Sequence, residues 1–342
     1  MAEHKAGHIN IPVFIPHLGC PNMCVFCNQR FISGVEEFRA ENARREIEKV
    51  LSSARGTDSE CEIAFFGGSF TGIDRALMIS LLNMAEEYVK RGDVSGIRMS
   101  TRPDYIDDEI IDILKRYTIS AVELGIQSFD EKVLKASKRG HSAVDSRRAM
   151  LALKNSGFKT VGQMMIGLPM STSESEKECA EEICKLGASA ARIYPTIVFR
   201  NTELHSSTVN GDYRPLTVDE AVIRSADVLE IFIENDVDCL RIGLCESENL
   251  HAESSYYAGP NHPSLGELVY SEIYRREVGK KLMGTDVAGK NVIIEVPRGD
   301  ISQAVGQAKR NKRFIIERFR AKNVRFVEND TLKKYKIAIK VD

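Results

Sequence analysis

The chain has 342 residues, which is enough for one barrel-sized domain and a small appendage, because domains run to about 100–250 residues. Its 43% hydrophobic and 28% charged residues and its net charge of −2 are ordinary for a globular protein. No apolar run approaches the roughly 20 residues that span a bilayer, and residues 1–10 lack a signal peptide's apolar core, so we expect a cytoplasmic protein with no membrane partner.

Short apolar or β-branched runs alternate with helix-patterned segments, which is typical of a parallel sheet built from βα units. The predicted strands cover residues 9–15, 62–66, 97–101, 121–127, 160–166 and 191–196. The predicted helices cover residues 41–54, 75–91, 107–117, 144–156 and 173–185. Six units are fewer than the eight that close a barrel, so the sequence predicts an α/β fold with a partial (β/α)6 TIM-like barrel, and ligands at the carboxyl ends of the strands.

The later segments predict a smaller second domain. A helix at 218–234 and a strand near 239–243 extend the barrel wall, whereas residues 249–266 have the composition of a loop. Beyond the loop we expect a strand, helices, and two strands, at residues 291–296, 301–320, 324–327 and 335–341. The predicted domains are therefore a barrel over 1–248, a connecting or lid segment over 249–290, and a small basic α+β domain over 291–342.

The charge is concentrated in this last part of the chain. Residues 275–342 contain 18 Lys and Arg against 8 Asp and Glu, a balance of +10, so the other 274 residues carry −12. A basic surface that faces nucleic acid is one interpretation of this asymmetry, and a solvated basic face without a special role is the other.

Three cysteines, Cys20, Cys24 and Cys27, directly follow the first predicted strand. Their spacing lets one loop hold three corners of a [4Fe-4S] cubane and leaves the fourth iron without a protein thiolate. That iron can bind S-adenosylmethionine (SAM), and one electron, from an external donor of the flavodoxin or ferredoxin type, then cleaves SAM to a 5′-deoxyadenosyl radical. The alternative is a tetrahedral zinc site formed by the cysteines and His17.

Further candidate cofactor contacts follow the other predicted strands. Gly67 and Gly68 let the backbone approach a ligand closely, and their carbonyls can accept from the amino group of SAM. Gln127 suits the ribose and Arg139 the carboxylate, although Arg139 at a solvated surface is the alternative. The remaining candidates are Phe26 in the cysteine loop, Gln163 on the fifth strand and Tyr194 on the sixth, where Tyr194 can equally be a wall residue.

No residue can be assigned a catalytic role from the sequence. Arg192, in the sixth predicted strand, needs a carboxylate or an anionic ligand as its partner, since an unpaired buried guanidinium is unfavourable. Together with Tyr194 and Arg200, it is a candidate for the steps after radical formation by its position alone.

Residues 8–248 resemble the radical SAM half of the Elongator catalytic subunit and its bacterial relatives. The similarity is densest in ELGIQSFDEKVLKASKRGHS, MMIGLP and RIYPTIVFRNTEL, between Glu123 and Leu204. More distantly, the chain resembles oxygen-independent coproporphyrinogen oxidases, which share the cysteine loop, the Gly-Gly motif and the glutamine after the fourth strand.

The resemblance implies a radical SAM barrel in which the cluster on the three cysteines binds SAM. The further SAM contacts that it implies are Gly67, Gly68, Ser100, Gln127, Arg139 and Gln163. It also implies a tRNA-modifying enzyme that builds a carboxymethyl group on C5 of the wobble uridine from SAM and acetyl-CoA. The implied partner is tRNA, bound through the basic C-terminal region.

One departure from the family concerns acetyl-CoA. Elongator-type proteins carry an acetyltransferase domain after the barrel, and the residues from Asn291 onward are too few for one. The stretch from Gln303 to Ala308 matches a Q-x-x-G-x-A signature of acetyl-CoA binding, but we interpret it as a chance match within an amphipathic helix. The use of acetyl-CoA is therefore left open. The alternatives to a tRNA enzyme are a radical SAM enzyme for a small molecule or tetrapyrrole, and a non-catalytic iron–sulfur protein.

Overall fold

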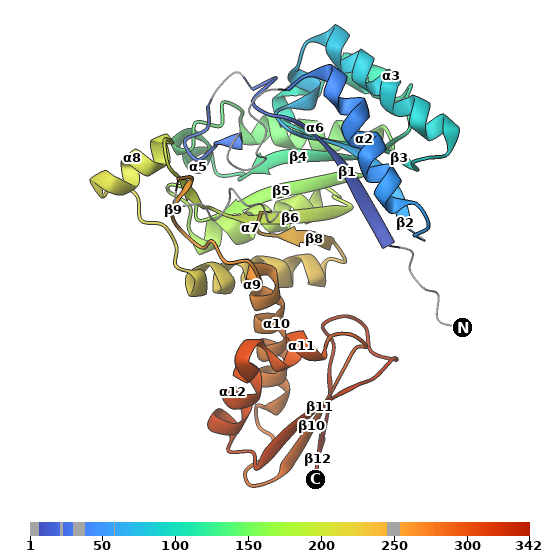
Figure 1. Cartoon of the computed structure of the whole chain (residues 1–342). Coiled ribbons are helices and arrows are strands. Elements are labelled where there is room, and N and C mark those ends of the chain that lie inside the picture. The colour runs from blue at the N-terminus through green and yellow to red at the C-terminus, as the bar shows by residue number, and fades with distance from the viewer. Residues whose placement is uncertain (1–6, 21–22, 30–37, 58, 245–253) are drawn as a thin grey trace. The chain divides into compact units, whose positions relative to one another are not determined.

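The computed structural model describes residues 7–20, 23–29, 38–57, 59–244 and 254–342. The chain divides into two compact units (Figure 1). Unit 1 comprises the residues up to 216 together with 231–259, and unit 2 comprises residues 217–230 and 260–342. The three-part domain division predicted from the sequence stays a prediction.

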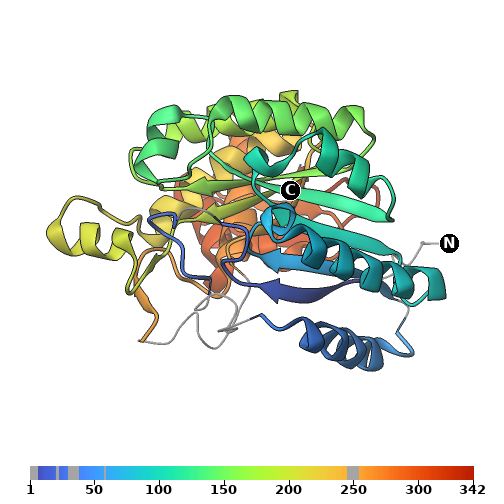
Figure 2. The same cartoon turned by 90° about the horizontal axis from the view of Figure 1, so that it is seen from above.

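Within the described residues, unit 1 is built on a seven-stranded parallel sheet. Its strands in spatial order are β1 (Gly7–Ile15), β2 (Ser59–Gly67), β3 (Gly96–Thr101), β4 (Ile119–Gln127), β5 (Thr160–Ile166), β6 (Ala190–Pro195) and β8 (Asp238–Ile242). The sheet curls into a half-barrel, with connecting helices on its outer face (Figure 2). This confirms the predicted partial barrel and the additional wall strand near residue 239.

The helices of the barrel follow the strands in βα order. They are α2 (Ala40–Ala54), α3 (Arg75–Arg91), α4 (Asp108–Leu114), α5 (Glu131–Ala136), α6 (Ala143–Asn155), α7 (Ser173–Lys185) and α8 (Glu203–Asn210). The next helix, α9 (Val218–Glu234), belongs to unit 2 as far as Glu230. Sequence signals set their ends, as α3 illustrates: the side chain of Asp74 accepts from the backbone N–H of Leu77, and Gly92 ends the helix in the left-handed conformation at φ +78°. No helix in the described part of the chain has the length and apolar character to cross a bilayer.

A short two-stranded sheet lies beyond the carboxyl end of β6. It pairs β7 (Val198–Phe199) with β9 (Tyr256–Ala258) in antiparallel fashion. Beside it, the backbone N–H of Leu204 at the start of α8 donates to the carbonyl of Val25 at 2.8 Å. This small sheet and α8 therefore pack against the loop that carries the cysteines.

Unit 2 contains a three-stranded sheet in the order β11-β10-β12, in which β10 is parallel to β11 and antiparallel to β12. Alternate residues of β10, Val292, Ile294 and Val296, are buried in the core of the unit. The elements of this unit after α9 are α10 (Leu265–Leu282), β10 (Asn291–Val296), α11 (Ile301–Val305), α12 (Arg310–Phe319), β11 (Asn323–Glu328) and β12 (Ala338–Val341).

This part of the chain contains one helix that was not predicted, and one expectation for it is wrong. The predicted connecting segment contains the 18-residue helix α10, whose buried face includes the polar side chains of Ser271 and Glu272, so its apolar pattern is interrupted. The Q-x-x-G-x-A match does not lie within one continuous helix. The chain leaves α11 at Gly306, with φ +76°, and continues through Ala308 in the left-handed region.

Candidate functional site

A cavity of about 270 Å³ lies at the carboxyl ends of the unit 1 strands. Parallel barrels hold their ligands at this edge, because the strand-to-helix loops converge there. Most of the candidate site residues predicted from the sequence line the cavity together. They are Cys20, Phe26, Cys27, Gly67, Gly68, Ser100, Gln127, Arg139, Gln163 and Tyr194.

Cys24, the third predicted cluster ligand, lies behind the cavity wall. It is 8% exposed, and Nη1 of Arg139 donates to its Sγ at 3.1 Å. The other terminal nitrogen of Arg139 donates to the carbonyl of Gly125 at 2.6 Å. Arg139 is thus buried rather than solvated, and it joins the end of β4 to the cysteine loop.

The cysteine loop combines sulfur donors with nearby positive charge. Burial raises the pKa of the Cys27 thiol to about 12, and burial also raises the pKa of Cys20, whereas the guanidiniums of Arg102 and Arg139 oppose that rise. A thiol with a raised pKa keeps its proton at neutral pH unless a metal replaces that proton. Soft sulfur ligands beside two cations fit an anionic iron–sulfur cluster.

His17, the fourth ligand of the alternative zinc set, has a different partner in the structure. Among the described residues, no three His, Cys, Asp or Glu side chains are gathered around one point as a single metal ion requires. The ring Nε2 of His17 instead accepts from the backbone N–H of Gln29 at 3.2 Å. The ring of His17 therefore takes part in shaping the cysteine loop.

The two glycines after β2 are required by close backbone contacts. A Cβ added to Gly68 would lie 2.1 Å from the carbonyl oxygen of Leu18, and Gly67 has φ +107°. The carbonyl of Gly67 accepts from the side-chain amide of Gln29. The Gly-Gly turn therefore holds the cysteine loop against β2 as well as lining the cavity.

Gln127 has an unusual backbone and an unsatisfied side chain. It lies at an irregularity at the end of β4 and adopts φ +67°, a left-handed conformation that is uncommon for residues other than glycine. Its Oε1 is buried and has no hydrogen-bond partner among the described residues. Backbone strain with a buried unpaired acceptor is typical of a ligand-binding position.

The floor of the cavity is an ionic network centred on Glu123. Its carboxylate is 1% exposed and lies 2.8 Å from Nε of Arg192 and 3.5 Å from Nη1 of Arg98. Nε2 of Gln163 donates to the same carboxylate at 2.8 Å and to Oγ of Ser100 at 3.2 Å. The carboxylate partner predicted for Arg192 is therefore Glu123.

The sequence analysis did not predict several residues that line the cavity, among them Arg102 and Gln29. Arg102 is 4% exposed and pairs with Asp104 at 2.8 Å, and its Nη1 has no hydrogen-bond partner among the described residues. Its position directly after the end of β3 is a signal that could have identified it. Gln29, whose side chain reaches Gly67, gives no such signal, because its contact depends on how the loop folds.

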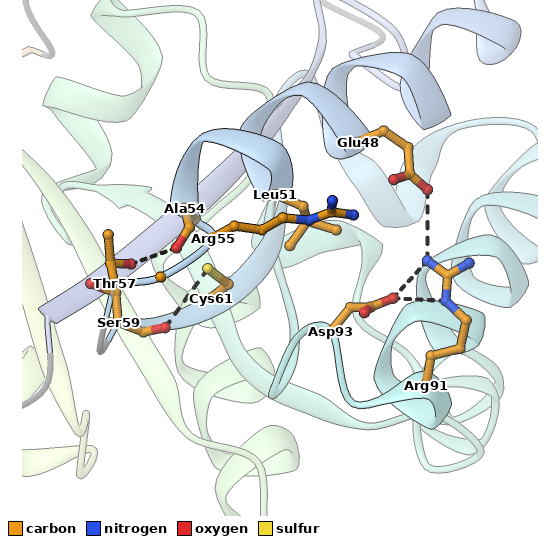
Figure 3. Close-up of a pocket in the computed structure, with 10 residues that line it drawn as sticks. Glu48, Leu51, Ala54, Arg55, Thr57, Ser59, Cys61, Arg91 and Asp93 are labelled. Atoms are coloured by element: carbon orange, nitrogen blue, oxygen red, sulfur yellow. Dashed lines mark hydrogen bonds and ion pairs between the residues drawn. The ribbon is translucent and has the colours of Figure 1, made fainter.

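A larger hollow of about 520 Å³ lies at the opposite, amino end of β2 (Figure 3). Arg91 crosses it in ion pairs with Asp93 at 2.6 Å and Glu48 at 3.6 Å. Glu48, Arg91 and Asp93 pair with one another there, and of the described cysteines only Cys61 lines the hollow. We therefore take the cavity beside the cysteine loop as the candidate site.

Comparisons with known proteins show which family the chain belongs to. A sequence model described as the Radical SAM superfamily matches residues 14–183, and one described as the Radical_SAM C-terminal domain matches residues 188–275. An uncharacterized protein of Methanocaldococcus jannaschii is 29% identical over 239 residues, which are 67% of this chain and 73% of that protein.

Similarity to Elongator-type proteins covers less of their length. A tRNA uridine(34) acetyltransferase of Methanocaldococcus infernus is 35% identical over 127 residues, 36% of this chain and 24% of that protein. A solved structure of N-terminally truncated Elp3 from Methanocaldococcus infernus superposes with a TM-score of 0.60 at 23% identity, over 79% of this chain and 63% of that chain. This likeness shows a shared fold.

Proposed function

Because the chain belongs to the radical SAM superfamily, we propose that Cys20, Cys24 and Cys27 hold a [4Fe-4S] cluster and that SAM binds beside it in the cavity at the barrel mouth. The family implies both groups. When bound, the cluster supplies the electron that cleaves the sulfonium of SAM and releases a 5′-deoxyadenosyl radical. The observation that carries the proposal is the meeting of the cysteine loop and the strand-end residues around one cavity.

The protein's own residues have distinct roles in this proposal. Gly67 and Gly68 line the cavity without side chains and so leave room for the amino acid part of SAM, while a Cβ at Gly68 would collide with the carbonyl of Leu18 in the cysteine loop. The unpaired Oε1 of Gln127 is an acceptor for a hydroxyl group of the ribose. The remaining proposed SAM contacts are Phe26, Ser100, Arg139, Gln163 and Tyr194.

We further propose that the substrate is RNA, most specifically a tRNA with a uridine at the modified position. The names of Elongator-type relatives support this class of substrate, although the chain spans only 24% of the tRNA uridine(34) acetyltransferase that it matches. The excess of Lys and Arg over residues 275–342 supports an electrostatic contact with the phosphate backbone. Acetyl-CoA is not part of the proposal.

The test is anaerobic turnover of the reconstituted protein with SAM, a low-potential flavodoxin or ferredoxin as reductant, and total tRNA. We expect 5′-deoxyadenosine and a new or altered uridine nucleoside, compared by mass before and after the reaction. If 5′-deoxyadenosine forms while the nucleosides stay unchanged, the substrate is a small molecule and the RNA part of the proposal is wrong. If no 5′-deoxyadenosine forms, the protein is a non-catalytic iron–sulfur protein.

A further inference from the structure

The cysteine loop is packed against the small β7–β9 sheet. Val25, Val198 and Leu204 form a buried apolar cluster, and Phe26 and Ala258 pack against it. Because β7 follows β6, on which Tyr194 lines the cavity, the small sheet lies at the mouth of the barrel. A molecule bound on its exposed face would therefore be held close to the reacting centre.

One aromatic side chain of this sheet faces outward. Side chains alternate along a strand, and the neighbours of Tyr257 on β9, Tyr256 and Ala258, both pack onto buried clusters. Tyr257 is 36% exposed and belongs to neither cluster. The ring thus contributes little to the core of unit 1 and is available for an external contact.

Two nitrogen-rich side chains frame the Tyr257 ring. The guanidinium carbon of Arg200 lies 5.2 Å from the ring centroid, and the imidazole of His205 meets the ring edge-on with centroids 4.4 Å apart. The backbone N–H of Arg200 donates to the carbonyl of Ser255 at 2.8 Å, which ties the two segments together. Tyr257 on β9, Arg200 in the turn after β7 and His205 on α8 are here called the mouth platform, and Tyr257 meets the other two only in the folded chain.

The chemistry of the mouth platform matches that of single-stranded RNA binding. Unpaired bases stack on aromatic rings and guanidinium planes, and positive charge attracts the neighbouring phosphates. We propose that the mouth platform stacks an unpaired base of the RNA substrate and so presents a neighbouring nucleotide to the barrel mouth. This inference rests on the proposed function, since it takes RNA as the substrate.

The test measures binding of a tRNA-derived stem–loop to the reconstituted protein by fluorescence anisotropy at one fixed salt concentration. We expect Tyr257→Ala to weaken binding about 5- to 150-fold, the range that stacking of one base on an aromatic ring provides. Tyr257→Phe keeps the ring and should bind as the wild type does. The matched control is Tyr117→Ala, a partly buried tyrosine just before the amino end of β4 whose hydroxyl bonds to Asn83.

A second measurement needs no substitution at the platform. A stem–loop with 5-iodouridine in its unpaired loop is irradiated with the wild-type protein, and we expect the cross-linked peptide to contain Tyr257. Unaltered affinity of Tyr257→Ala, or cross-links confined to other peptides, would overturn the inference while leaving the proposed function intact. If the wild-type protein binds no stem–loop RNA, both the inference and the proposed RNA substrate are wrong.

Discussion

At Glu123, one carboxylate fixes several side chains of the cavity floor. It accepts from Arg192 and Gln163 and lies within 3.5 Å of Arg98, so the positions of these three groups depend on it. Barrel interiors are usually filled with branched aliphatic side chains, and burying an ion pair is often no more stable than that arrangement. The network therefore serves to position Gln163 and Arg192 rather than to maximise stability.

Glu123→Gln should destabilise the protein strongly, because it removes the carboxylate that pairs with the buried guanidinium of Arg192 at 2.8 Å, whereas Arg98 keeps Glu62 at 3.0 Å. Removing one partner of a buried ion pair typically costs about 3–5 kcal/mol. Glu87→Gln is the matched control, since Glu87 pairs with Arg44 at the surface and such pairs contribute about 0–1 kcal/mol. Urea unfolding measures both. Equal free energies of unfolding for the two variants would contradict this account of the network.

His141 should make stability depend on pH. Burial, with Arg139 and Arg102 nearby, lowers its pKa from 6.5 to about 3, so the unfolded chain binds more protons than the folded one between these values. This contribution to stability is fully present above pH 6.5 and is lost as the pH falls toward 3. In urea unfolding at pH 7.5 and 5, His141→Asn should lose less stability than the wild type. His262→Asn is the control variant. If His141→Asn loses as much unfolding free energy between pH 7.5 and pH 5 as the wild type does, His141 is not the group responsible for the pH dependence.

Sequence reasoning identified site residues where a strand-end position marks them. The cysteines, Gly67 and Gln127 all follow predicted strands, and their convergence follows from the parallel barrel. Gln29 and the mouth platform could not be predicted, because their contacts join loops whose paths no local pattern specifies. Arg102 was missed although its position carries the same signal as Gln127.

At the scale of elements, the cysteine loop can pack against β2 only because of the turn that follows this strand. The backbone N–H of Gly68 donates to the carbonyl of Ile15 at 2.7 Å, and that of Ser69 donates to Leu18 at 2.9 Å. These hydrogen bonds tie the end of β1 and the start of the cysteine loop to the turn after β2. The conformation of the cysteine loop therefore depends on the two glycines of that turn as well as on the spacing of the cysteines.

Gly68→Ala should displace the cysteine loop, because its Cβ would meet the backbone of Leu18 at 2.1 Å. We expect a loss of about 1–3 kcal/mol of stability and a lower iron content after reconstitution. Gly279→Ala is the control: nothing lies within 4 Å of its added Cβ, and alanine in a helix is more stable than glycine by about 0.5–1 kcal/mol. Normal iron loading of Gly68→Ala would show that the turn does not hold the loop.

The predicted elements of the barrel agree with the structure because their patterns are strong. α3, α7 and β5 have the predicted bounds, since caps such as Asp74 and Thr172 mark their ends. The helix α10 was missed because the polar Ser271 and Glu272 are buried on it, and such partners are visible only in the fold. Local patterns predict elements with one apolar face better than elements buried among polar groups.

At the scale of the whole molecule, the uneven charge should govern RNA binding. The plot of log K against log salt concentration has a negative slope, and each phosphate contact that a variant loses makes this slope shallower by about 0.9. Replacing the exposed Lys309 and Arg313 of unit 2 by Gln should therefore reduce the slope by up to about 2. Replacing the exposed Lys90 and Lys154 of unit 1 by Gln is the control for net charge. Equal slopes for the two double variants would remove the basic region from the proposed interface.

The most direct measurement of the central claim is SAM cleavage by the anaerobically reconstituted wild-type protein with dithionite as reductant. We predict 5′-deoxyadenosine from the wild type and from Cys61→Ala, and none from Cys24→Ala, although both cysteines are 8% exposed. A reconstituted wild-type protein that holds iron and sulfide but forms no 5′-deoxyadenosine, or a colourless one that holds zinc at the cysteine loop, would contradict the account.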